Sequence, residues 1–95
     1  MSKENPSEKQ SRQEAVQKAE TVKQTYEHML LAKRNVVGVG VGLRQVQGVW
    51  TNTISLVVMV RKKLPASQLS PDDLIPAEIE GIPVDVQEVG ELTAQ

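Results

Sequence analysis

The sequence contains no cysteine, no phenylalanine and only two aromatic side chains, Tyr26 and Trp50. Without thiols the chain can form no disulfide, no thiolate nucleophile and no thiolate metal site. Its hydrophobic content of 39% lies below the roughly 45–50% that is typical of globular domains. The core must therefore consist of valine, leucine, isoleucine and methionine, which suit flat packing on a sheet better than a deep aromatic pocket.

The sequence also has little net charge and no long apolar stretch. The 11 basic and 12 acidic side chains give a net charge of −1, which offers no electrostatic footprint for nucleic acid. No apolar stretch approaches the length of a membrane span, and residues 1–14 lack the apolar core that a secretory signal requires. We therefore expect a cytoplasmic protein that binds neither nucleic acid nor membrane.

The length of 95 residues provides room for one domain. Residues 1–12 are polar and are expected to form a flexible N-terminus. A single α+β domain then covers residues 13–90, with a helix over about 13–34 and a sheet domain over about 35–90. Residues 91–95 are expected to be a short tail.

An apolar stripe predicts the helix. Its members recur at alternating spacings of four and three residues: Ala15, Ala19, Val22, Tyr26 and Met29. The stripe could pack on the chain's own sheet or on a neighbouring subunit, because it begins before a short sheet could cover it. Both alternatives remain open at this point.

Glycine alternates with valine in residues 36–43, which predicts a strand. The period of two puts Gly38, Gly40 and Gly42 on one face and the valines on the other. Two further strands are predicted over residues 53–63 and 84–89, with a hairpin connection at Gly48. The expected fold is a long N-terminal amphipathic helix packed on a small three-stranded, mainly antiparallel sheet, with a short helical loop before the last strand.

The glycine run does not have the features of a phosphate-binding loop. It lacks the G-x-G-x-x-G spacing, a following helix, and the Lys-Ser or Lys-Thr pair of a Walker-type loop. Without Cβ atoms, however, this face allows the close approach of another backbone. We interpret that neighbour as the chain's own helix, through Ala15 and Ala19; a ligand or a partner strand is the alternative.

No catalytic or metal-binding pattern is present in the sequence. His28 is the only histidine, and no nucleophile-elbow motif surrounds any serine, so a Ser-His-Asp arrangement is not predicted. The acidic pairs, Asp72 with Asp73 and Glu78 with Glu80, lack the longer ligand series of a calcium loop. We expect no catalytic residue, no metal site and no cofactor, and hence no enzyme.

Three separated motifs carry a resemblance to a known kind of domain. They are residues 35–42 (NVVGVGVG), 57–65 (VVMVRKKLP) and 75–86 (IPAEIEGIPVDV), and residues 89–90 (VG) extend the third. The region 28–90 resembles a small β-rich domain found ahead of trypsin-like peptidase domains in bacterial proteins and also as stand-alone proteins of unknown function. In such proteins the catalytic residues belong to the peptidase domain, so the resemblance implies no catalytic role for any position in this chain.

Three functional hypotheses follow. The leading one is a non-catalytic structural or scaffold module that forms a homo-oligomer; the second is an adaptor that binds another protein, such as a peptidase, by strand addition or helix docking. The third is a small-ligand domain that uses the glycine face. The expected interaction residues are Val22, Tyr26, Met29, Gly38, Gly40, Gly42 and Trp50.

Overall fold

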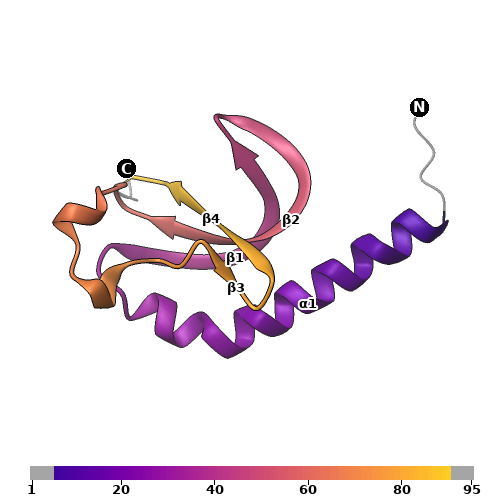
Figure 1. Cartoon of the computed structure of the whole chain (residues 1–95), viewed down its shortest axis with the longest axis horizontal. Coiled ribbons are helices and arrows are strands. Elements are labelled where there is room, and N and C mark those ends of the chain that lie inside the picture. The colour runs from indigo at the N-terminus through magenta and orange to yellow at the C-terminus, as the bar shows by residue number, and fades with distance from the viewer. Residues whose placement is uncertain (1–5, 91–95) are drawn as a thin grey trace, which may run out of the picture.

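The computed structural model describes the backbone of residues 6–90 and the side chains of residues 10–90. One long helix is followed by four strands and two short 3-10 turns (Figure 1). The elements in chain order are α1 (Pro6–Leu31), β1 (Val36–Val46), β2 (Val49–Val60), η1 (Ala66–Gln68), η2 (Pro71–Asp73), β3 (Glu78–Ile79) and β4 (Ile82–Glu88). The predicted α+β class with an N-terminal helix is confirmed.

The sheet is mixed, with the strand order β1-β2-β4-β3. Strands β1 and β2 are antiparallel, β2 and β4 are parallel, and β3 and β4 are antiparallel. Two features differ from the predicted sheet: the short strand β3 is an additional member, and β4 runs parallel to β2. The parallel pair arises because residues 61–81 carry the chain back along the sheet before β4 begins, as a parallel connection requires.

A tight turn joins β1 to β2. Its two central residues, Gln47 and Gly48, have φ values of 51° and 81°. Positive φ at both positions is the requirement of the type I′ hairpin turn, whose twist matches that of the flanking strands. The hairpin connection predicted around Gly48 is therefore confirmed.

The core lies between α1 and one face of the sheet. Ala19, Val22 and Leu30 are the buried residues of the helix, and they pack in one cluster with buried side chains of the strands: Leu56, Val58, Val60, Ile79, Ile82 and Val84. Within the described part of the chain, Ala19, Val22 and Tyr26 of the predicted stripe therefore pack on the chain's own sheet, whereas Met29 is exposed.

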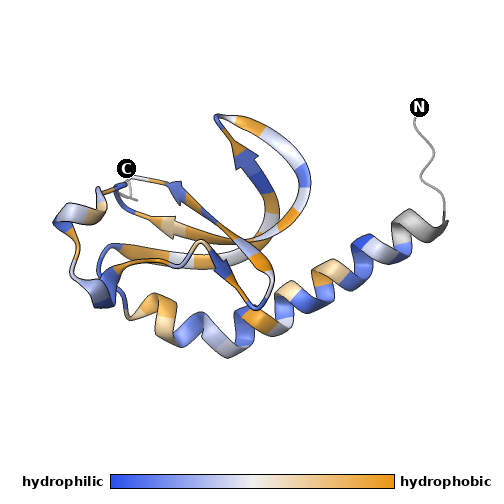
Figure 2. Ribbon diagram, viewed as in Figure 1, coloured by the Kyte–Doolittle hydropathy of each residue, from blue (hydrophilic) through white to orange (hydrophobic). Residues whose placement is uncertain are grey.

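The helix bounds differ from the predicted 13–34 at both ends. Helix α1 begins at Pro6, so residues 6–12, expected to be flexible, are helical, and it ends at Leu31. Its first half extends past the sheet and is mostly hydrophilic (Figures 1 and 2). Residues 10–14 are all polar and exposed, which explains why hydrophobic periodicity alone did not predict them as helix. Residues 1–5 and the expected tail 91–95 lie outside the described residues.

The interpretation that α1 lies on the glycines is wrong. The register pairs Gly38 with Met59, Gly40 with Val57 and Gly42 with Ser55, on the face opposite the buried cluster. The atoms nearest to a Cβ built on these glycines belong to the β2 side chains of Met59 and Val57. The helix packs on the valine face because valine side chains bury apolar area that glycine cannot offer.

The glycine face is instead the inner face of a curled sheet. The backbone N–H of Gln45, near the end of β1, donates to Asp85 Oδ2 on β4 at 2.9 Å, although β2 separates these two strands. Asp85 pairs with Val57 and so shares the face of the glycines. Register irregularities at both ends of β1 accompany the bend, as β-bulges do. Small residues on the concave side give the strands room to curl (Figure 1).

Candidate functional site

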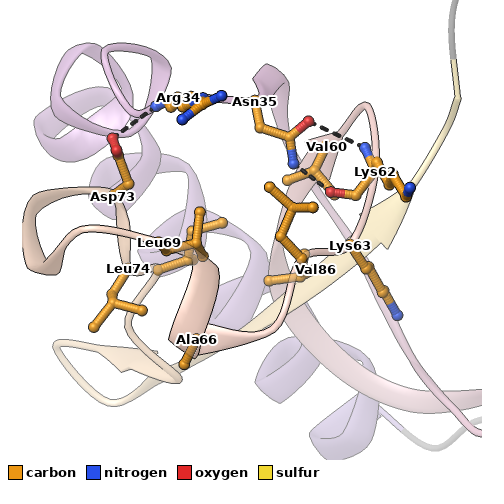
Figure 3. Close-up of a pocket in the computed structure, with 12 residues that line it drawn as sticks. Arg34, Asn35, Val60, Lys62, Lys63, Ala66, Leu69, Asp73, Leu74 and Val86 are labelled. Atoms are coloured by element: carbon orange, nitrogen blue, oxygen red, sulfur yellow. Dashed lines mark hydrogen bonds between the residues drawn. The ribbon is translucent and has the colours of Figure 1, made fainter.

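A pocket of about 390 Å³ opens where α1 ends and β2 leaves the sheet. We call it the helix-end pocket. Val60 and Val86 line it from the sheet, and Leu69, Leu74 and Ile75 line it from the loop that carries the two 3-10 turns (Figure 3). Its walls are therefore mainly apolar, and they come from segments that are far apart in the sequence.

Asn35 fixes one wall of the helix-end pocket. Its φ of 78° lies in the left-handed region, which asparagine adopts more readily than most residues, and it follows the end of α1. The Asn35 Oδ1 accepts a hydrogen bond from the Lys62 N–H at 3.1 Å, its Nδ2 donates to the Lys62 carbonyl, and its own carbonyl accepts from the Arg61 N–H at 2.9 Å. The helix end is thereby fastened to the end of β2.

Asp73 fixes the opposite wall. Its Oδ1 accepts from the backbone N–H of Arg34 at 2.9 Å, and its Oδ2 accepts from the Ser70 hydroxyl at 3.0 Å. These two hydrogen bonds, the backbone one foremost, lower the pKa of Asp73 below its usual value. The Lys33 Nζ also donates to the Asp72 carbonyl at 2.6 Å. The loop around η2 is therefore held to the end of α1 by charge-assisted contacts.

Basic side chains gather at the rim of the helix-end pocket. Arg34, Lys62 and Lys63 belong to its lining and are all exposed. Within residues 10–90, the ammonium groups of Lys62 and Lys63 have no hydrogen bond or ion pair; the two residues bond only through their backbones. The site thus combines an apolar interior with two lysine ammonium groups that form no ion pair within the described residues.

A second candidate surface is the free edge of β1 together with the β1–β2 hairpin. In the described sheet no strand pairs with the outer edge of β1. Apolar side chains are exposed along β1 and at the hairpin: Val37, Leu43, Val46, Val49 and Trp50. Val49 and Trp50, at 66% and 60% exposed, are the most exposed large apolar residues of the described chain.

The structure does not bring the seven predicted interaction residues into one site. Val22 is 4% exposed and lies in the chain's own core, whereas Met29 is exposed on α1. Tyr26 is half-buried against the core, and the Glu80 carboxylate, hydrogen-bonded to its hydroxyl, raises the pKa of this phenol. Trp50 lies at the hairpin, on a different element from all of these.

The three predicted glycines line the concave face rather than a ligand site. A Cβ on Gly38 would come within 2.8 Å of the Met59 Cε, and one on Gly42 within 3.4 Å of a Val57 methyl group. Side chains of β2 therefore already occupy part of the space that the glycines leave. Gly40 has more room, with its nearest neighbour at 4.0 Å.

The sequence reasoning missed the helix-end pocket. The basic run at residues 61–63 is visible in the sequence and can be interpreted as a charged strand end, but nothing local places Leu69 or Leu74 beside it. That proximity depends on the long connection between β2 and β4. The only local signal is Asp73 close after Ser70, which predicts a turn but not its contact with Arg34.

Among residues 10–90, no group of three or more histidine, aspartate or glutamate side chains is placed to hold a metal ion. No helix in the described part of the chain is both long enough and apolar enough to cross a membrane. In comparisons with known proteins, no family model matches this chain, and no curated protein matches it in sequence.

Proposed function

We propose that this protein is a non-catalytic structural module that self-associates into a homo-oligomer through the free edge of β1. One observation carries the proposal: β1 is an eleven-residue edge strand whose outer edge no described element pairs with. Such an edge presents a row of backbone N–H and C=O groups that can add a strand from another chain.

The two edges of the sheet differ in a way that supports this proposal. The opposite edge, β3, is only two residues long, which is one of the usual protections against edge pairing. Strand β1 contains no proline and no lysine, Arg44 is its single charged residue, and its register irregularities lie toward its ends, so its central part has none of the common protections. Strand β1 is therefore the longer and less protected edge of the sheet.

The residues of α1 do not favour an interface in which the helices of two subunits pair. The exposed half of the helix offers residues 10–14, which are polar, and the apolar stripe begins only at Ala15. Coiled-coil pairing requires apolar residues repeating along the whole contact. The helix therefore lacks the seam that an extended interface between subunits would use.

A second copy is the occupant that best fits the β1 edge. Two β1 strands related by a two-fold axis would pair antiparallel, so that the same residues contribute from both subunits. The exposed apolar side chains of Val37 and Val46, near the two ends of β1, would then lose part of their exposure to water. Binding of a different protein at this edge, as in an adaptor, is the alternative that the experiment must separate.

The test is the molar mass of the purified protein, measured by light scattering and sedimentation over a wide range of concentrations. The edge variant Val37→Lys/Val46→Lys places lysine, one of the usual protections against edge pairing, near both ends of the β1 edge. It should weaken association at least about tenfold, equivalent to about 1.4 kcal/mol. The control variant Met29→Lys/Leu31→Lys makes the same change at similarly exposed positions on α1 and should associate as the wild type does.

Two results would contradict the proposal. A wild-type protein that stays monomeric at the highest concentration reached would exclude self-association and favour the adaptor alternative. Loss of association in the α1 variant, with the edge variant unaffected, would move the interface from the sheet edge to the helix.

A further inference from the structure

The helix-end pocket plays no part in the proposed self-association. None of its lining residues belongs to β1, and the hairpin residues Val49 and Trp50 are also absent from it. Its volume of about 390 Å³ lies within the range of about 300–1,000 Å³ that is usual for small-molecule sites. The helix-end pocket is therefore a candidate site separate from the β1 edge.

Apolar side chains dominate the interior of the pocket. Val60 is almost fully buried at 2% exposed, whereas Leu74 is 40% exposed beside the opening. Leu69 and Val86 are half-buried on the loop side and the sheet side (Figure 3). An apolar group that enters this space removes its own surface and that of Leu74 from water, which is the main source of affinity in such sites.

Charge at the rim is of one predominant sign. Three lining residues, Arg34, Lys62 and Lys63, are cationic, and one, Asp73, is anionic, whereas the whole chain has a net charge of −1. Asp73 is already engaged by the Arg34 N–H and the Ser70 hydroxyl. Figure 3 shows the Lys62 and Lys63 side chains extending away from the apolar residues, so a bound negative charge would lie at the opening and not in the interior.

The backbone N–H groups of the two rim lysines are not available to a ligand. The Lys62 N–H donates to Asn35 Oδ1, and the Lys63 N–H donates to Glu88 Oε1 at 2.7 Å. Recognition of a compact, highly charged anion such as phosphate relies on converging donors of this kind. The two lysines therefore offer only their flexible side-chain cations, and these suit a single negative charge on a ligand whose apolar part supplies most of the affinity.

We propose that the helix-end pocket binds an amphipathic monocarboxylate, with its apolar chain against Val60, Leu69 and Val86 and its carboxylate at the opening beside Lys62 and Lys63. The apolar interior and the cationic rim together select this ligand class. A neutral alcohol lacks the charge, and a short carboxylate lacks the apolar chain.

The probes are hexanoate, octanoate and decanoate, titrated into the full chain while the backbone amide NMR signals are followed. Each added methylene that leaves water should tighten binding about fourfold until the pocket is full. Shifts should concentrate at residues 60–64, 69–75 and 86. Decanol, which has the same apolar chain without the charge, should bind about two- to fivefold more weakly than decanoate, the range expected for exposed ion pairs.

Two variants locate the site. Leu74→Glu places a carboxylate at the edge of the pocket and should weaken decanoate binding at least about tenfold, whereas Leu74→Met conserves the apolar wall and should bind as the wild type does. Lys62→Gln/Lys63→Gln should reduce decanoate binding to the level of decanol. Lys23→Gln/Arg44→Gln removes the same charge from positions outside the lining and should have no effect.

The proposal fails if decanoate gives no saturable shifts below the concentration at which it forms micelles. It also fails if the shifts concentrate at Val46, Val49 and Trp50, because the probe would then be binding the exposed hairpin. Equal affinity for decanoate and decanol would refute the role of the cationic rim. Unfolding of the Leu74→Glu variant would be detected from its amide spectrum, and the lysine pair would then decide the location.

Discussion

Replacing Gly40 with alanine tests whether another backbone lies against the glycine face of the sheet. A Cβ at this position would have its nearest neighbour, Met59 Cε, at 4.0 Å, an ordinary van der Waals contact, and Gly40 does not have positive φ. An alanine that fits without strain restricts the unfolded chain, which stabilises a protein by about 0.4–1 kcal/mol. We therefore expect Gly40→Ala to be more stable than the wild type.

The same substitution at Gly48 provides a matched control of opposite sign. Gly48 has φ of +81° and no atom within 4 Å of a built Cβ, so the cost of alanine there is a backbone cost alone. That cost is about 1–2 kcal/mol for an L-residue in the left-handed region. The gain from restricting the unfolded chain is common to both variants, so their stabilities should differ by the backbone cost alone, about 1–2 kcal/mol.

The assay is urea unfolding of wild type, Gly40→Ala and Gly48→Ala at one fixed protein concentration, because any self-association makes stability depend on concentration. A fall in stability of more than about 1 kcal/mol in Gly40→Ala would refute the reasoning. It would mean that a backbone lies against the glycines, as in the original interpretation. If the loss appeared only at high protein concentration, that backbone would belong to a second copy.

The remaining predictions concern the core and the walls of the helix-end pocket. Leu30→Ala should cost about 2–5 kcal/mol in urea unfolding because Leu30 is fully buried, whereas Met29→Ala, at an exposed position, should stay within about 0.5 kcal/mol of the wild type. Asn35→Ala should lower the free energy of unfolding by about 1–3 kcal/mol. Asn35→Gly should recover only the part of this loss that comes from the positive φ, because glycine still lacks the side-chain hydrogen bonds to β2. The folded-state pKa of Asp73 is lowered, so its stabilising contribution is present above the unfolded pKa of about 3.9 and is lost as pH falls through the folded value. The stability advantage of wild type over Asp73→Asn should accordingly shrink below about pH 4, and no shrinkage in urea unfolding across that range would contradict the assignment.

Local patterns in the sequence account for much of the fold. Helical periodicity placed Ala19 and Val22 correctly on the buried side of α1 but put the exposed Met29 there as well, and Gly48 indicated the hairpin connection. The start of the helix at Pro6 was not predictable from hydrophobic spacing, because the first turns have no apolar stripe. Their contribution to helix formation is one of propensity and charge, which is a weaker signal than periodicity.

Long-range pairing is what the sequence could not determine. The alternation in β1 separates the valine and glycine faces, but it does not say which face α1 covers; that depends on β2 contributing Leu56 and Val58 to the same side. The direction of β4 relative to β2 was also open, because a single strand carries no signal of parallel or antiparallel pairing. The helix-end pocket depends on both, and therefore appeared only in the structure.

The parallel pairing of β4 with β2 has a consequence for how the chain is made. The β1–β2 hairpin is complete once Val60 has been synthesised. Strand β4, which pairs with the other edge of β2, ends only at Glu88. At usual rates of translation this leaves a delay of roughly one to six seconds, during which the hairpin has two unpaired edges instead of one. The nascent chain is therefore most vulnerable to association with its neighbours on a polysome just before its last strand arrives.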